Sequence, residues 1–263
     1  MLKEAIRKFL NKKGYEIIKQ PYLGERYPCV KEGHALYYQT PIGNYYLPDD
    51  AMKDGIADAM ARGIVFDTEI VEIAKQYIKP GTAALDVGGN FGQMAILFSK
   101  FVGENGKVYV FEAQDKVFDY LNRNIKANDC RNIICKDGAV YNVNDKILIF
   151  PEPDINASNA YGANSINPNL KSGREVKTFT IDSMNIQEPI SFMKVDIQGS
   201  DLFAMQGAKN TILKNKMPII FEFEQQFQDQ FGTTFDDYVN FINEIGYKFV
   251  KTIMNINYLI VPR

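Results

Sequence analysis

Two acidic residues follow buried apolar segments and could bind a nucleoside. Asp86 lies in a glycine-rich turn, Leu85-Asp-Val-Gly-Gly-Asn-Phe-Gly92, and Glu112 follows the apolar run Lys107–Phe111. Small residues in such a turn let a ligand approach the main chain closely. A carboxylate after the second strand of a doubly wound sheet can accept hydrogen bonds from both hydroxyls of a ribose. Together they predict a nucleoside site; a plain glycine-rich turn with a surface Glu is the alternative.

The spacing of this turn does not fit a dinucleotide. Asn90 occupies the place of the second glycine in the pattern G-x-G-x-x-G. Asp86 would repel a pyrophosphate, whereas it would hold an ammonium group directly or through water. A ligand that combines a ribose with a cationic amino acid is S-adenosylmethionine, and this is the cofactor that we predict.

Four charged side chains near later strands could carry chemistry. Lys194 and Asp196 share one face of a predicted strand, and Glu222 and Glu224 share one face of the next. Central strands normally carry apolar residues on both faces, so charges here mark the ligand crevice at the carboxyl ends of the strands. We predict Asp196 as the acid nearest to the transferred group, with Glu222 or Glu224 beside it. Lys194 would keep a carboxylate ionised; a buried ion-pair network is the alternative.

Two mechanisms remain open for these side chains. In one, Asp196 and Glu222 hold a divalent cation that acidifies an acceptor hydroxyl. In the other, which we favour, a carboxylate acts directly as a base or an orienting acceptor, and no metal is bound. The single histidine, His34, is a further candidate base, although a lone histidine near a hairpin is more often structural or exposed.

Several segments repeat the motifs of one known family in the same order. Asp86–Gly92 resembles D-x-G-A-N-x-G, Val110–Glu112 resembles F-E-P, and Phe192–Asp201 resembles L-K-x-D-x-E-G-x-E. The remaining matching segments are Arg62–Glu69, Lys136–Val140, Glu175–Ser183 and Gln206–Ala208. On these motifs the chain resembles, over residues 62–224, the FkbM family of S-adenosylmethionine-dependent methyltransferases.

The resemblance implies methyl transfer from S-adenosylmethionine, with S-adenosylhomocysteine as the product. It implies that the glycine-rich turn surrounds the methionine part of the cofactor, that Glu112 binds the ribose, and that Asp137 flanks the adenine. The cofactor-binding residues that it implies are Asp86, Gly88, Gly89, Asn90, Gly92, Glu112, Ala113, Asp137, Gly138 and Ala139.

Three positions depart from the family pattern. Gly89 replaces the usual Ala, Ala113 replaces Pro, and Gln198 stands where the family usually has Glu. If that Glu is a base in relatives, Gln198 cannot take its place, because an amide does not titrate.

The resemblance also implies an acceptor. FkbM-like proteins are associated with decoration of glycans, polysaccharides and polyketides, so we expect an O-methyltransferase that acts on a sugar hydroxyl. The sugar would belong to a nucleotide sugar or to a precursor of a bacterial capsule or lipopolysaccharide. Tyr37, Tyr38, Tyr45 and Tyr46 could stack on it, although Tyr on a hairpin usually packs. The alternatives are a non-sugar small molecule as acceptor, and a cofactor-binding scaffold without catalysis.

The composition excludes other classes. In 263 residues, 30 Lys and Arg face 32 Asp and Glu, and the net charge of −2 argues against binding nucleic acid through bulk positive charge. Asp196-Ile-Gln-Gly also replaces the (D/N)-P-P-(Y/F) strand end of nucleic-acid amino-methyltransferases. Three Cys without paired spacing predict buried free thiols. No segment approaches about 20 apolar residues, so we expect a cytoplasmic protein without a membrane span; a homo-oligomer is left open.

Alternating strands and helices must position these residues. From Asp67 onward the pattern predicts a doubly wound, seven-stranded, mostly parallel α/β sheet of the Rossmann-like methyltransferase type. The last two strands are only a few residues apart, so they should pair antiparallel at one edge. The expected strands are 83–87, 107–111, 132–135, 146–150, 192–196, 218–224, 247–253 and 258–261, and the expected helices are 68–77, 93–101, 116–127, 202–213 and 235–245.

Residues 1–65 lack this regular alternation of strands and helices. We predict that they form a small N-terminal cap on a methyltransferase domain of residues 66–263. The cap should hold an amphipathic helix over 1–13, a β-hairpin over 35–48 and a helix over 50–62. An Asn-rich stretch over 154–169 is either a functional loop or a product of genomic drift.

Overall fold

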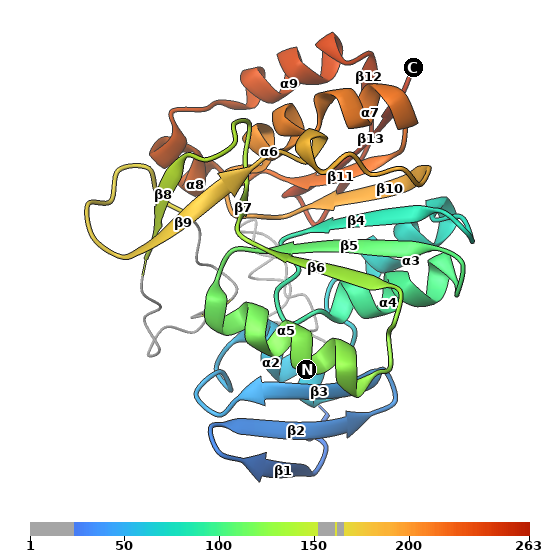
Figure 1. Ribbon diagram of the computed structural model, residues 1–263, viewed down its shortest axis with the longest axis vertical. Coiled ribbons are helices and arrows are strands. Elements are labelled where there is room, and N and C mark those ends of the chain that lie inside the picture. The colour runs from blue at the N-terminus through green and yellow to red at the C-terminus, as the bar shows by residue number, and fades with distance from the viewer. Residues whose placement is uncertain (1–23, 152–160, 162–165) are drawn as a thin grey trace, which may run out of the picture.

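The computed structural model describes residues 24–151, 161 and 166–263 (Figure 1). A central sheet carries most of the helices, and a small three-stranded sheet at the N-terminal side lies next to a long helix. The predicted helix over 1–13 and most of the Asn-rich stretch lie outside the described residues. Within the described part of the chain, no helix is both long and apolar enough to cross a membrane.

The central sheet has seven strands in the order β12-β13-β11-β10-β4-β5-β6. Five neighbours from β11 to β6 are parallel, and β13 is antiparallel to both β11 and β12. The predicted fold class is confirmed, including the antiparallel hairpin at one edge. The strands are β4 (Ala83–Val87), β5 (Lys107–Glu112), β6 (Ile133–Asp137), β10 (Ile190–Val195), β11 (Ile219–Glu222), β12 (Tyr247–Ile253) and β13 (Asn257–Pro262).

Alternating apolar side chains let helices pack on both faces of this sheet. In β4, Leu85 packs in the cluster formed with α6, α7 and α9, whereas Ala84 packs in the cluster formed with α3, α4 and α5. The predicted helix over 202–213 is in fact two helices, which meet at Ala208. The helices are α3 (Thr68–Tyr77), α4 (Gln93–Val102), α5 (Asp115–Ala127), α6 (Asp201–Gly207), α7 (Lys209–Asn215) and α9 (Phe235–Glu244).

A second small sheet follows β6. The predicted strand over 146–150 exists as β8 (Ile147–Phe150), but it pairs antiparallel with β9 (Arg174–Phe179) and lies outside the central sheet. Strand β7 (Ala139–Val140) pairs parallel with β9 on the other side. We did not predict β7, β9 or the short helix α8 (Gln225–Phe231) as elements, because each lies in a stretch without a long periodic pattern.

The N-terminal cap packs on the helical side of the central domain. Its sheet is β1 (Cys29–Glu32), β2 (Ala35–Thr40) and β3 (Gly43–Pro48), and the helix α2 (Gly55–Ala61) follows. The predicted hairpin is confirmed, whereas the helix begins five residues later than predicted. The Asp54 side chain caps it by accepting from the backbone N–H groups of Ile56 and Ala57.

Helix α5 holds the cap through its side chains. Asn124 Oδ1 accepts from the Tyr46 backbone N–H at 2.6 Å, and Asn128 Oδ1 accepts from that of Asn44 at 2.9 Å. Residues of the cap and of α4 and α5 share one apolar cluster, so the cap does not have a core of its own. The boundary between residues 65 and 66 stays a prediction.

The cysteines correct one expectation. All three are free thiols, as predicted, but Cys29 is exposed on β1. Strand β1 is an edge strand of the cap sheet, and in the described part of the chain its four residues are all exposed. Cys130 and Cys135 are half-buried.

Candidate functional site

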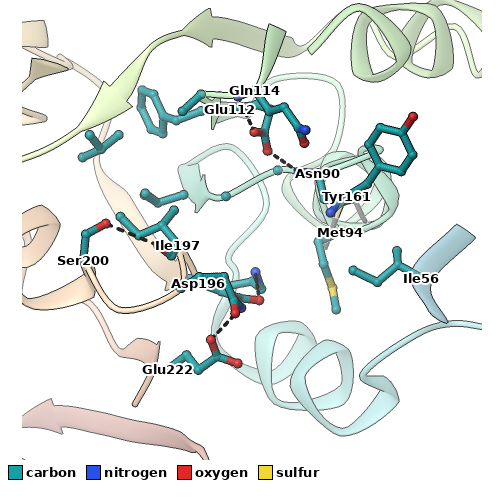
Figure 2. Close-up of a pocket in the computed structure, with 18 of the residues that line it drawn as sticks. Ile56, Asn90, Met94, Glu112, Gln114, Tyr161, Asp196, Ile197, Ser200 and Glu222 are labelled. Atoms are coloured by element: carbon teal, nitrogen blue, oxygen red, sulfur yellow. Dashed lines mark hydrogen bonds and ion pairs between the residues drawn. The ribbon is translucent and has the colours of Figure 1, made fainter. Parts of the chain in front are cut away.

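A cavity of about 500 Å³ opens where β4, β5, β10 and β11 end. Its volume is typical of a small-molecule site, and it lies where β10 and β4, far apart in the sequence, run side by side. Figure 2 shows Glu112 and Gln114 at one end and Asp196 and Glu222 at the other. We call the first, with Gly88, Gly89 and Asn90, the glycine-turn end. The second, with Asp67, Lys194, Gln198 and Glu224, is the carboxylate end.

The glycine-rich turn packs tightly against the protein itself. A Cβ at Gly88 would lie 2.0 Å from the Asp196 carbonyl oxygen, and the φ of +88° also favours glycine. A Cβ at Gly89 would lie 2.2 Å from Val110 Cγ2. Gly88 and Gly89 line the cavity, but contacts within the chain already require them to be glycine. Glycine at these positions is therefore explained by packing within the chain as well as by the tight turn and the approach of a ligand.

Gly92 is a case of the same kind at the start of α4. Its φ is +88°, and an added Cβ would lie 2.6 Å from Leu121 Cδ1. Gly92 is not among the residues that line the cavity. Its position in the turn is therefore explained by helix packing, and the cofactor contact that we predicted for it stays a prediction.

Glu112 is oriented by two backbone groups at the glycine-turn end. Its Oε2 accepts from the Asn90 N–H at 2.9 Å, and its Oε1 accepts from the Gln114 N–H at 2.8 Å. Burial raises the pKa of Glu112, and the two hydrogen bonds act in the opposite direction without cancelling this effect. Each carboxylate oxygen has a second lone pair, so both remain able to accept a hydroxyl proton from a diol. Ala113, Gly138 and Ala139 line the wall beside it, as predicted for cofactor-binding residues.

Two predicted cofactor residues lie away from the wall. Asp86 is fully buried and does not line the cavity, and neither of its carboxylate oxygens has a hydrogen-bond partner. Burial raises its pKa to about 7, against the attraction of Lys194. Asp137 pairs with Glu112 across β5 and β6, but it is exposed and also lies outside the wall. The Asp86 carboxylate lies instead beside Lys194, whose Nζ is 3.9 Å from its Oδ1.

Lys194 is a buried cation in the middle of the central sheet. Its Nζ lies 3.0 Å from Asp196 Oδ2 and 3.9 Å from Asp86 Oδ1, and its side chain is 4% exposed. Burial opposes its charge, but the carboxylates of Asp196 and Asp86 outweigh burial and raise the pKa of Lys194. The pairing that we predicted between Lys194 and a carboxylate is present.

Gln198 joins the two acids of the carboxylate end. Its Nε2 donates to Asp196 Oδ1 at 3.0 Å and to Glu222 Oε2 at 2.8 Å. Gln198 has a φ of 52°, a left-handed conformation that turns its side chain back over β10 and β11. The departure from the family pattern therefore places a neutral donor between two carboxyl groups.

Asp196 and Glu222 differ in protonation. Burial acts to raise the pKa of Asp196, but Lys194 and the hydrogen bonds from Lys194, Gln198 and Glu222 lower it. Burial and the charge of Asp196 raise the pKa of Glu222 to about 11. Within the pair, Asp196 is therefore the acid that favours the ionised form, and Glu222 is the one that favours the protonated form.

Glu224 lines the same end of the cavity but stands outside this network. It is half-buried, and its Oε2 accepts from Gln226 Nε2 at 2.8 Å. Of the two residues that we placed beside Asp196, Glu222 is therefore the one connected to it. The side chain of His34 is 96% exposed and does not line the cavity, so it is not positioned to act as a base there.

The hairpin tyrosines are a correction. Tyr38 and Tyr45 are buried in the cap, and Tyr37 and Tyr46 stack on each other with ring centroids 4.6 Å apart. None of these four residues lines the cavity, so the sugar-stacking role that we considered for them is wrong. They stabilise the cap, which was the alternative.

Several residues of the wall come from segments that sequence reasoning did not single out. Asp67 adopts a φ of 52° before α3, and burial and the charge of Asp196 raise its pKa to about 6. Ile56 of α2 brings the cap to the wall, and Met254 contributes from the turn between β12 and β13. Tyr161, from the Asn-rich stretch, lines it too. The Arg62–Glu69 motif contains Asp67, the predicted cap helix contains Ile56 and the Asn-rich stretch contains Tyr161, but none of these residues was singled out.

The cavity fits the cofactor that the sequence predicts. The glycine-turn end offers a carboxylate with spare acceptor capacity, and the unpartnered, buried Asp86 carboxylate lies below the turn. Within the described residues, no group of three or more His, Cys, Asp or Glu side chains is arranged to hold a metal ion.

A glycine-rich turn after the first strand, an acid after the second and a cavity at the crossover point define a nucleoside-binding α/β enzyme. The model of the methyltransferase FkbM domain matches residues 86–249, more than half of the chain, so the chain belongs to this family. It is an S-adenosylmethionine-dependent methyltransferase, and the resemblance of its motifs is confirmed.

Solved structures with a similar fold are distant in sequence. An FkbM methyltransferase from Methylobacillus flagellatus KT is 16% identical, with a TM-score of 0.46, over 72% of this chain and 49% of that chain. A putative rRNA-methylase from Clostridium thermocellum is 12% identical, with a TM-score of 0.47, over 74% and 93% of the two chains. A putative methyltransferase from Streptococcus mutans in complex with SAH is 12% identical, with a TM-score of 0.44, over 75% and 97%. No curated protein matches the chain.

Proposed function

We propose that this methyltransferase transfers a methyl group from S-adenosylmethionine to a hydroxyl group of a sugar. The observation that carries the proposal is the pair at the carboxylate end. Asp196 lines the cavity with Lys194 Nζ 3.0 Å from its Oδ2. Lys194 lowers the pKa of Asp196, whereas burial and the charge of Asp196 raise the pKa of Glu222. An ionised carboxylate in a cavity is suited to accept the proton of an acceptor hydroxyl as the new bond forms.

The glycine-turn end would bind the cofactor. Glu112, oriented by the N–H groups of Asn90 and Gln114, would accept hydrogen bonds from the ribose hydroxyls. Gly88, Gly89, Ala113, Gly138 and Ala139 would form the surrounding wall. Asp86, Gly92 and Asp137 would act from behind that wall, through charge or packing. When bound, the cofactor supplies an electrophilic methyl group on a sulfonium.

The carboxylate end would then act on the acceptor. Asp196 would accept the hydroxyl proton, which typically contributes a rate factor of about 10²–10⁴. Lys194, 3.0 Å away, keeps Asp196 ionised, and Gln198 keeps it directed toward the cavity. The proton transfer that we propose is direct, with no divalent cation between Asp196 and the hydroxyl.

A transfer assay tests the function. Purified protein would be incubated with S-adenosylmethionine labelled in its methyl group and with a panel of free sugars, sugar phosphates, nucleotide sugars and non-sugar alcohols. We expect label in a sugar, unaffected by exhaustive chelation of divalent metals. The Asp196→Asn protein serves as the control for Asp196-dependent transfer.

Three results would contradict the proposal. Label in non-sugar alcohols alone would favour a different small molecule as acceptor. No transfer to any compound, from a protein that binds S-adenosylhomocysteine by calorimetry, would favour the scaffold. Activity that is lost with chelation and restored by a divalent cation would replace direct proton transfer with a metal mechanism.

A further inference from the structure

We infer that the acceptor hydroxyl belongs to an uncharged or amine-bearing molecule, such as a neutral or amino sugar, and that the cavity rejects phosphate-bearing acceptors such as nucleotide sugars. The inference rests on the proposed methyl transfer and narrows its acceptor. It comes from the charged side chains on the cavity wall, most of which are acidic. Among the described residues, the cavity is lined by six acidic side chains and by one basic side chain, Lys194. The acidic residues are Asp54, Asp67, Glu112, Asp196, Glu222 and Glu224.

Lys194 is not free to hold an anion. Its side chain is 4% exposed, and its Nζ lies 3.0 Å from Asp196 Oδ2 and 3.9 Å from Asp86 Oδ1. A phosphate that drew it away would leave the carboxylate of Asp86 buried without a partner, since that carboxylate has no hydrogen bond. Breaking a buried ion pair in this way is strongly unfavourable.

The rest of the carboxylate end would repel an anion. Asp196 is ionised beside Lys194, and Glu224 on the same wall has Gln226 as its partner and no cation. Asp67, whose pKa burial and Asp196 raise to about 6, adds a third acid that ionises near neutral pH. A phosphate or pyrophosphate placed here would meet like charges in a desolvated site.

An amine on the acceptor would find a partner in the same place. Glu224 is half-buried at the wall and outside the network of Lys194, Asp196, Gln198 and Glu222. It can therefore pair with an ammonium group without disturbing the base. A neutral sugar would use the same oxygens as hydrogen-bond acceptors, with less energy gained than for a charged donor.

Matched acceptor sets test this inference. Each set holds one sugar in four forms, for example glucosamine, glucose, glucose 6-phosphate and UDP-glucose, and the labelled methyl group is counted in each. We expect the amine and neutral members to be methylated at least about tenfold faster than both phosphate-bearing members. Glu224→Gln should reduce the ratio of amine to neutral turnover by about threefold or more, whereas Glu72→Gln, an exposed residue of α3, should leave it unchanged.

The outcomes separate the inference from the function. A phosphate-bearing member that is methylated best in its set overturns the inference and leaves sugar methylation standing. If no sugar is methylated, the proposed function fails, and the inference is decided by binding alone. UDP would then be titrated into protein loaded with S-adenosylhomocysteine; binding tighter than about 1 mM by calorimetry overturns the inference, and no binding supports it.

A different observation, at the glycine-turn end, carries a second inference. Gln114 is 3% exposed and lines the cavity, yet its side-chain Nε2 has no hydrogen-bond partner among the residues that the structure describes. Figure 2 shows Gln114 beside Glu112, the residue that receives its backbone N–H at 2.8 Å. A buried amide without a partner is costly, so we infer that Gln114 donates a hydrogen bond to the nucleoside part of the bound cofactor.

The backbone supports this placement. The Gln114 backbone N–H donates to Glu112 Oε1. Gln114 therefore cannot move away from the cavity without breaking this hydrogen bond to the acid that would bind the ribose. The side-chain amide is therefore held next to the carboxylate that would accept the ribose hydroxyls. It offers a donor where Glu112 offers acceptors, and a nucleoside presents both kinds of group.

Calorimetry with unreactive ligands tests Gln114. Gln114→Met keeps the length of the side chain and removes the donor, so S-adenosylhomocysteine and adenosine should both bind about five- to tenfold more weakly. The unliganded variant should melt at the same or a higher temperature, since an unpartnered amide is removed. Gln226→Met, at the carboxylate end of the same cavity, is the matched control and should not change either affinity.

Three results would overturn the role of Gln114. Unchanged affinity for S-adenosylhomocysteine would show that the amide makes no contact with the cofactor. A loss confined to S-adenosylhomocysteine, with adenosine binding unchanged, would move the contact to the amino-acid part. If the unliganded Gln114→Met protein melted at a lower temperature, and if Gln114→Met and Gln226→Met lost equal affinity for both ligands, Gln114 would have a role in folding instead.

Discussion

The two ends of the cavity are built in different ways. The glycine-turn end comes from short, contiguous pieces of chain: the turn after β4, the end of β5, and the residues after β6. The carboxylate end joins side chains from β10 and β11, from the residues that follow these strands, and from the residue before α3. A methyltransferase can thus keep one cofactor-binding end while the other changes with the acceptor.

The difference extends to the electrostatics. At the glycine-turn end, Glu112 is held by backbone N–H groups, which no substitution of a neighbouring side chain can remove. At the carboxylate end, Lys194, Gln198 and Glu222 hold Asp196 with side chains alone. A single substitution at the carboxylate end should therefore change turnover and leave cofactor binding at the glycine-turn end intact.

The largest expected effect is that of Asp196→Asn. Asparagine keeps the shape but cannot accept the proton of the acceptor, so kcat should fall by about 10²–10⁴. Affinity for S-adenosylhomocysteine should stay within about threefold, because Asp196 lies at the opposite end from Glu112. Steady-state kinetics and calorimetry check the two parts separately. Comparable losses in both would mean that the two ends are not independent.

Gln198→Glu should have an intermediate effect that depends on pH. A third carboxylate beside Asp196 and Glu222 would replace a donor with a charge and raise the pKa of Asp196. Since Asp196 must be ionised to act, a higher pKa moves the acidic limb of kcat/KM to higher pH. The loss should be largest at acidic pH, where it approaches about tenfold for each unit by which the pKa of Asp196 rises, and should shrink as the pH rises.

The pH profile of kcat/KM measures this effect. Gln226→Glu adds the same charge at an exposed position of the wall and is the control, for which we expect no such displacement. An acidic limb that stays in place in the Gln198→Glu protein would remove Gln198 from the role of positioning Asp196.

Asp86 allows a test of stability at the glycine-turn end. Burial raises its pKa to about 7 in the folded protein, above the ordinary value of 3.8. A carboxyl group whose pKa is higher in the folded than in the unfolded protein contributes to stability at low pH. That contribution is lost as the pH rises through the pKa of the folded protein. The stability of Asp86→Asn relative to the unsubstituted protein should therefore increase between about pH 4 and pH 7, then level off.

Urea denaturation at several pH values measures this difference. Asp67 and Asp201 also have raised pKa values, but they are present in both proteins and cancel in the comparison. A difference that is independent of pH would mean that Asp86 is already ionised at low pH in the fold.

The same contrast explains what could be predicted from the sequence. The glycine-rich turn and Glu112 are local, so their spacing along the chain was enough to place them. The opposing acid Asp67 and the cap residue Ile56 reach the wall only through the packing of α2 and α3, which no local pattern encodes. Asp86 lies beside the turn, as its place in the sequence indicates, whereas its burial beside Lys194 of the neighbouring strand could be seen only in the structure. Its contact with the cofactor stays a prediction.

Gln198 shows an intermediate case. Its departure from the family pattern was visible, and the loss of a titratable group followed at once. Its bridge between Asp196 and Glu222 depends on a left-handed backbone and on the register of β10 with β11. That geometry could be seen only in the structure.

The smallest expected effect tests the outer face of the cap. Tyr46 stacks on Tyr37, lies with the Arg123 guanidinium 4.1 Å from its ring centroid, and does not line the cavity. Tyr46→Leu should therefore leave acceptor KM within about twofold. The loss of the cation–π contact, about 0.5–1 kcal/mol, should lower the melting temperature by only about 2–4 °C. Ile56→Gln, on the inner face of the cap, should instead raise acceptor KM. A reversed pattern would mean that the acceptor contacts the hairpin rather than the inner face of the cap.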